Sequence, residues 1–173
     1  KIVNLNTLYI NSLNAVTEVE EKRNANKNAI HTRQQAYLNL KSTSTRIINQ
    51  LDILGLTEGV LAQAKSLNNL IQGTRKKKKE VDEETGEEKK TASTSRQSYT
   101  QLADNFSKIL QLLVTIPAYN PNLEELKLVN LTAYHTTLVE STKNVDITEA
   151  ELNTKLIERN NILYKNGTGL YTI

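Results

Sequence analysis

Histidines and carboxylates are the residues of this chain from which a catalytic or metal centre would have to be built. A carboxylate-bridged di-metal site in a helical bundle uses Glu-x-x-His pairs on facing helices. Here Asn28 stands three positions before His31, and Thr132 stands three before His135. The sequence has no glycine-rich phosphate loop, no Gly-x-Ser-x-Gly motif and no cysteine. We therefore expect no catalytic residue, no metal and no cofactor, and a protein that is not an enzyme.

Basic side chains offer a different chemistry, the binding of phosphate groups. The basic run consists of Arg75, Lys76, Lys77, Lys78 and Lys79. It begins a segment, 75–90, in which thirteen of sixteen residues are charged, seven basic and six acidic. The acidic residues neutralise the run, and no aromatic side chain lies among the lysines to stack on bases. We expect the charged insert 74–94 to be an exposed excursion, either a small β-hairpin or a disordered loop. Weak nucleic-acid binding through Lys76 to Lys79 is an alternative function.

The composition favours long helices and an aliphatic core. The chain has 173 residues, one Phe, seven Tyr and no Trp, with only two Pro and six Gly. Scarce Pro and Gly disfavour a β fold with many turns. No apolar run approaches the roughly 20 residues that span a bilayer. Because the sequence has no methionine, we expect a fragment of a longer, processed protein. The composition also favours an exported protein.

Hydrophobic spacing predicts four helices, at about 3–54, 57–72, 95–116 and 122–165. The last of these contains no Pro or Gly between Pro121 and Gly167. Its apolar residues recur at helical spacing: Leu128, Leu131, Leu138, Val145, Leu152, Leu156 and Leu163. Asp146 to Glu149 would also suit a helix N-terminus, so this helix either continues there or breaks. Thr94 to Gln97 has the pattern of a capping box for the third helix.

These lengths predict an all-α, antiparallel four-helix arrangement in a single elongated domain, 1–173. Two short helices would cover only one half of the two long ones. Below about Arg33 and Thr142, the first and last helices would form a two-stranded, coiled-coil-like stalk. An exposed Leu/Val seam there would self-associate or bind another protein. The candidate interaction residues on the stalk are Leu13, Val16, Val19, Val145, Leu152 and Leu156.

The C-terminal third also carries a resemblance. The matching residues are Ile116-Pro117-Ala118-Tyr119-Asn120-Pro121-Asn122, Glu125-Leu126, Leu131, Arg159-Asn160, Leu163-Tyr164 and Thr168-Gly169-Leu170. In these positions the chain resembles an uncharacterised family of all-helical proteins from Bacteroidetes bacteria. The resemblance implies a helical fold and a chain that continues past residue 173. It brings no activity, and the charged insert is not part of the pattern.

Three classes of function follow from these observations. The leading hypothesis is a structural or protein-interaction helical bundle, because the stripes are long and reactive groups are absent. A membrane-active, pore-forming-like bundle is an alternative, but its inserting hairpin would have to carry the charges of 75–90 into lipid at several kcal/mol each. Nucleic-acid binding through the basic run is the third class. No small-molecule substrate is evident.

Overall fold

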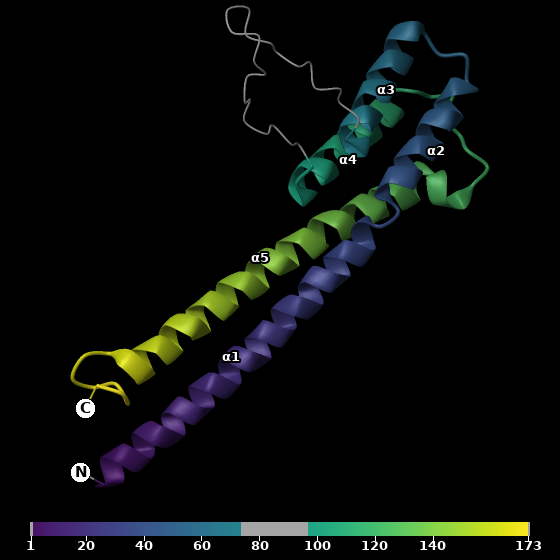
Figure 1. Cartoon of the computed structure of the whole chain (residues 1–173). Helices are drawn as coiled ribbons and strands as arrows, with labels where there is room; N and C mark the ends of the chain where they lie inside the picture. Colours follow the sequence, from purple (N-terminus) through teal and green to yellow (C-terminus); the bar gives the residue numbers. More distant parts are fainter. Residues whose placement is uncertain (1, 74–96, 173) are drawn as a thin grey trace, which may run out of the picture. The chain divides into compact units, whose positions relative to one another are not determined.

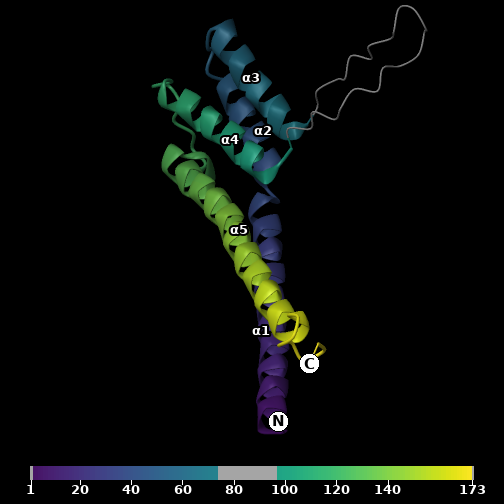
Figure 2. The same ribbon diagram turned by 90° about the vertical axis from the view of Figure 1, so that its left-hand side faces the viewer.

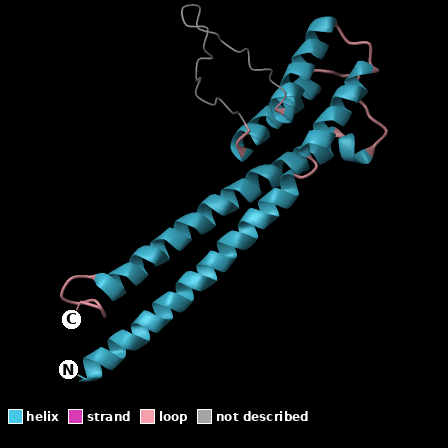
Figure 3. Cartoon of the chain, in the orientation of Figure 1, coloured by secondary structure: helices cyan, strands magenta, loops and turns pink. Residues whose placement is uncertain are grey.

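The described part of the chain is helical. A computed structural model describes residues 2–73 and 97–172, and no β-strand occurs within these ranges (Figure 3). The helices are α1 (Ile2–Tyr37), α2 (Leu40–Asp52), α3 (Glu58–Gln72), α4 (Tyr99–Val114) and α5 (Leu128–Tyr164), with a 3-10 helix, η1, at Glu124–Leu126 (Figure 1). The predicted all-α fold, with a long first and a long last helix, is confirmed. The insert 74–94, with its predicted hairpin or loop, lies outside the described residues.

The chain divides into two compact units. Unit 1 comprises Lys1–Ala36 and Glu140–Ile173, and therefore most of α1 and the larger part of α5. Unit 2 comprises Tyr37–Val139, which includes α2, α3, α4, η1 and the first turns of α5. The single domain predicted for 1–173 stays a prediction.

The predicted continuous helix 3–54 is wrong, because the chain leaves the helix at Leu38 and Asn39. The carbonyl oxygen of Asn39 accepts hydrogen bonds from the backbone N of Thr43 and from the hydroxyl of Ser42, each at 2.9 Å. These bonds organise the first turn of α2. Asn39 is therefore the N-cap residue of a new helix rather than an interior residue of a longer one.

Tyr37, the last residue of α1 before this break, is held by tertiary contacts within unit 2. The Tyr37 ring meets the Tyr99 ring edge to face, with centroids 4.8 Å apart. Its hydroxyl lies 3.0 Å from the carbonyl oxygen of Tyr99 and 3.2 Å from that of Leu138. A buried hydroxyl needs such partners, so Tyr37 is fixed between α4 and α5.

Unit 2 is built around an aliphatic core with one phenylalanine at its centre. Its fully or nearly fully buried residues include Leu40, Ile47, Leu51, Ala64, Ile71, Phe106, Ile109, Leu113, Leu126, Leu131 and Leu138. Burial of each large side chain contributes about 1.5–3 kcal/mol before the loss of conformational entropy is subtracted. The buried hydroxyl of Ser44 is satisfied by the side-chain oxygen of Asn68 at 2.7 Å.

The short helices end as the sequence predicts, within a few residues. The prediction 57–72 matches α3, for which Thr57 is the N-cap and Gly73, at φ +79°, the left-handed C-cap. The predicted third helix 95–116 is too long, because α4 begins at Tyr99. Its N-cap is Ser98, whose hydroxyl accepts a hydrogen bond from the backbone N of Gln101. The capping-box residues 94–96 lie outside the described residues.

The predicted last helix 122–165 is too long at its N-terminal end. After η1, Lys127 is extended (φ −65°, ψ 141°), and α5 starts only at Leu128. The Asn130 side-chain amide donates to the carbonyl oxygen of Glu124 at 2.6 Å, and the Tyr119 hydroxyl donates to that of Leu126 at 2.8 Å. Side-chain bonds to the backbone thus stabilise a separate turn before the helix.

At Asp146 to Glu149, by contrast, α5 continues without interruption. The hydroxyl of Thr148 lies 3.0 Å from the carbonyl oxygens of both Asn144 and Val145. It also lies 3.1 Å from the side-chain oxygen of Asn26 on α1. Thr148 therefore interacts with the preceding turn of its own helix and with α1, and caps no new helix.

Within unit 1, α1 and α5 lie side by side and run in opposite directions, as both views show (Figure 1, Figure 2). After Tyr164 the chain turns back on α5, where the backbone N of Tyr171 donates to the carbonyl oxygen of Leu163 at 3.0 Å. Gly169 permits this return, because a Cβ there would lie 2.6 Å from the backbone N of Lys165.

Candidate interaction surface

The contact line between α1 and α5 in unit 1, which we call the seam, is made largely of small and polar residues. On α1, the seam is formed by buried or partly buried side chains at alternating spacings of three and four: Ser12, Ala15, Val19, Lys22, Asn26 and Ala29. On α5 the corresponding residues are Ser141, Val145, Thr148, Leu152, Lys155, Arg159 and Ile162. Few of these side chains are large and apolar, so the seam buries little hydrophobic surface for its length.

Polar contacts fix the register of the seam. Lys22 pairs with Glu151 at 2.8 Å, and Asn26 lies level with Thr148 one turn further along. Moving the other way along α1, Glu18 pairs with Lys155 at 2.9 Å. Each step of four residues forward on α1 corresponds to a step of three or four backward on α5, as antiparallel pairing requires.

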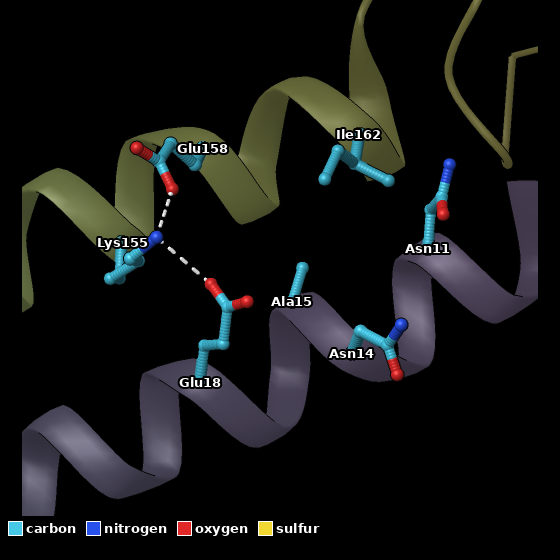
Figure 4. Close-up of a pocket in the computed structure, with 7 residues that line it drawn as sticks. All are labelled: Asn11, Asn14, Ala15, Glu18, Lys155, Glu158 and Ile162. Atoms are coloured by element: carbon cyan, nitrogen blue, oxygen red, sulfur yellow. Dashed lines mark hydrogen bonds and ion pairs between the residues drawn. The ribbon is translucent and has the colours of Figure 1, made fainter.

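A hollow of about 340 Å³ lies beside the seam (Figure 4). It is lined by Asn11, Asn14, Ala15, Glu18, Lys155, Glu158 and Ile162. The ammonium of Lys155 reaches both carboxylates, at 2.9 Å from Glu18 and 2.8 Å from Glu158. Hydrogen bonds, first to Glu158 and then to Glu18, raise the pKa of Lys155 above its ordinary value.

The chemistry of this hollow is that of a neutralised charge cluster. A lysine with a raised pKa remains protonated and cannot act as a general base or a nucleophile. Its two carboxylates are already hydrogen-bonded to the ammonium. The residues that line the hollow therefore supply no pair of groups suited to acid–base or nucleophilic catalysis.

The six stalk residues predicted from the sequence fall into different environments. Val19 and Val145 are buried in the seam, at 1% and 4% exposure, and are therefore occupied within the chain. Leu13 and Val16, by contrast, expose 56% and 43% of their surface. Leu152 and Leu156 are intermediate. Of these candidates, Leu13 and Val16 are the ones most accessible to a partner.

Tyr9 belongs to the same exposed surface and is not among the interaction residues predicted from the sequence. It is 57% exposed. The spacing of Tyr9, Leu13 and Val16 places the three side chains on one face of α1. A signal for this face is present in the sequence, because residues 2–17 contain no charged side chain at all.

The helical register places this face on one side of the seam, opposite the charged cluster. Val16 directly follows the seam residue Ala15, and Leu156 directly follows the seam residue Lys155 on α5. In an antiparallel pair, the residues that follow such positions on the two helices lie on the same side. Glu18, which precedes Val19, lies on the other side. We call the surface of Tyr9, Leu13, Val16 and Leu156 the apolar flank.

Neither histidine is part of the apolar flank. His31 is exposed, and the His135 ring lies 6.4 Å from that of Phe106 in unit 2. Residues 2–73 and 97–172 contain no cluster of three or more His, Cys, Asp or Glu suited to a metal ion. Within the same ranges, no helix has the length and apolarity of a membrane span. Arg75 and Lys76 to Lys79 lie outside the described residues.

Comparison with protein-family models, with curated proteins and with solved structures gave no match. The resemblance to helical proteins of Bacteroidetes stays a prediction. The function must therefore be inferred from the surfaces of the chain itself.

Proposed function

We propose that this chain is a non-enzymatic helical module that binds a protein through the apolar flank of unit 1. In this proposal α1 and α5 form an antiparallel coiled coil that presents the flank to the partner. The observation that carries the proposal is the exposure of Tyr9, Leu13 and Val16 on a charge-free half of α1.

The coiled-coil description is supported by the spacing of the seam. Buried and partly buried positions recur at alternating intervals of three and four on both helices, which is the heptad pattern of two paired helices. The ion pair between the seam residue Lys22 and Glu151, which lies beside the seam on α5, joins the two helices.

The apolar flank has the composition of an interface rather than of an ordinary surface. Single exposed leucines are common on proteins, but several large apolar side chains on one charge-free helical face are not. Charged residues are depleted, and tyrosine is enriched, at the centres of protein–protein interfaces. An exposed helical stripe of this kind suits the packing of another helix.

Site-specific photo-cross-linking tests the proposal. A photoreactive amino acid replaces Leu13 in the chain, which is expressed in its native cells, and any adduct is identified by mass spectrometry. The matched control carries the same amino acid at Asn24, an exposed residue further along α1. We expect a defined protein adduct from position 13 and none from position 24.

A Val16→Glu substitution should abolish the adduct from position 13, because a charge in the apolar flank must be desolvated when the partner binds. Circular dichroism checks that the variant keeps its helical content. If position 13 yields no adduct, or the same adducts as position 24, the proposed function is wrong.

A further inference from the structure

We propose that the protein bound to the apolar flank is a second copy of this chain, with α1 of each copy packed against α5 of the other. Two copies of unit 1 would then form an antiparallel four-helix arrangement about a two-fold axis parallel to the helices. This inference rests on the proposed interaction function and names its partner.

The apolar side chains suit this pairing at one end of the flank. A two-fold axis parallel to the helices keeps every residue at its own height, so α1 of one copy faces α5 of the other in the register seen within each chain. Because Glu18 is level with Lys155, Val16 comes within about one residue of Leu156 of the second copy. Tyr9 and Leu13 extend the same contact towards the start of α1.

Charge complementarity favours this arrangement beyond the apolar flank, on the same side of unit 1. Arg23 and Lys27 lie on the flank side of α1, about two and three turns beyond Val16. In the register set by Lys22 and Glu151, their counterparts on α5 are acidic, namely Glu149 for Arg23 and Asp146 for Lys27. On this side of unit 1, α1 therefore carries a net positive charge, because Arg23 and Lys27 outnumber Glu20, whereas α5 is acidic. When α1 of each copy faces α5 of the other, unlike charges oppose one another at both contacts.

These charges are also available to a partner. Within the described ranges, Lys27, Asp146 and Glu149 form no ion pair, and Arg23 pairs with Glu20 one turn away on its own helix. In an alternative dimer, α1 of one copy would pack antiparallel against α1 of the other. Arg23 and Lys27 of one copy would then face the uncharged residues 2–17 of the other, and Glu149 would face no basic residue. The opposite side of the seam is a poor alternative, because Glu18 and Glu158 are already neutralised there by Lys155.

Charge-segregated variants of the whole chain test this inference by analytical ultracentrifugation. The acidic variant is Arg23→Glu with Lys27→Glu, and the basic variant is Asp146→Lys with Glu149→Lys. In either variant alone, a homodimer would oppose like charges at every one of these contacts. In an equal mixture, α1 of each variant faces oppositely charged residues on α5 of the other.

The wild-type chain is expected to sediment as a dimer at about 0.1 mM, where even a weak specific complex is populated. Each variant alone should dimerise at least about tenfold more weakly, and the mixture should restore a one-to-one dimer. The variant with all four substitutions separates dimerisation from folding within the chain, because its own helices again carry opposite charges. It should dimerise with itself and not with the wild type.

A wild-type chain that stays monomeric, a mixture that fails to recover the dimer, or a basic variant that dimerises as the wild type does would each overturn the inference. The last result would show that α5 takes no part in the contact. A monomeric wild type with a specific adduct to a different protein from position 13 would leave the proposed function intact, whereas the loss of that adduct would remove both.

Discussion

The hydroxyl of Tyr37 offers a sharp test of how unit 2 is held together. It lies within hydrogen-bond distance of two carbonyl oxygens, those of Tyr99 at 3.0 Å and Leu138 at 3.2 Å. A phenol has one proton, so the two contacts share a single donor. Both carbonyls also belong to α-helices and face backbone donors four residues on, so neither becomes an orphan acceptor when the hydroxyl is removed.

Tyr37→Phe should therefore lower the free energy of unfolding by about 1 kcal/mol, the net value of one hydrogen bond, and not by the 2–3 kcal/mol expected when a buried group loses its only partner. The ring stays in place, so its edge-to-face contact with Tyr99 is kept. For a chain of this size, about 1 kcal/mol corresponds to a Tm lower by roughly 2–4 °C.

Urea unfolding followed by circular dichroism measures this difference. The matched control is Tyr9→Phe, which removes a hydroxyl from an exposed ring and should change stability by less than about 0.5 kcal/mol. The dependence on urea concentration should be the same in both variants. If Tyr37→Phe is as stable as the control, or costs more than about 3 kcal/mol, the account of a shared hydrogen bond is refuted.

Three further predictions concern glycine, the core and pH. Gly59→Ala, on α3 with open space around it, should raise stability by about 0.5–1 kcal/mol, whereas Gly73→Ala should lower it in the same thermal-melt assay, because its φ of +79° strains any L side chain. Phe106→Ala should cost about 3–5 kcal/mol in urea unfolding, because the ring is fully buried. Arg46 lowers the pKa of Glu125 by a hydrogen bond, so this pair's contribution is present above the carboxyl's unfolded pKa and is lost as the pH falls through its lower folded pKa. Glu125→Gln should flatten that part of the stability–pH curve.

Helix boundaries marked by local chemistry were predictable from the sequence. The end of α3 follows from Gly73, whose left-handed backbone conformation requires no tertiary contact, and its start falls at the expected Thr57, although the Thr57 side chain makes no capping hydrogen bond. The break at Asn39 was not predictable in this way, since no proline or glycine marks it. Beside the break, Tyr37 contacts α4 and α5, which are far from it in the sequence. The late start of α5 likewise depends on side-chain bonds from Tyr119 and Asn130.

The candidate surface was predictable only in part, for a related reason. Leu13, Val16 and Val19 all satisfy helical spacing, and their sequence neighbourhood does not say which of them faces α5. Once α5 occupies the line through Val19, Leu13 and Val16 remain on an outer face. The missing charges in residues 2–17 are a local signal and would have identified Tyr9 as well.

The polar seam of unit 1 also has a consequence for the whole chain. Residues such as Ser12, Asn26 and Thr148 specify register well but give two separate helices little reason to associate. In the intact protein α1 and α5 are joined through residues 37–139, and such a connection acts as a high effective concentration, of millimolar order for short flexible tethers. The covalent connection through residues 37–139 therefore favours a helix pair whose own contacts are weak but selective.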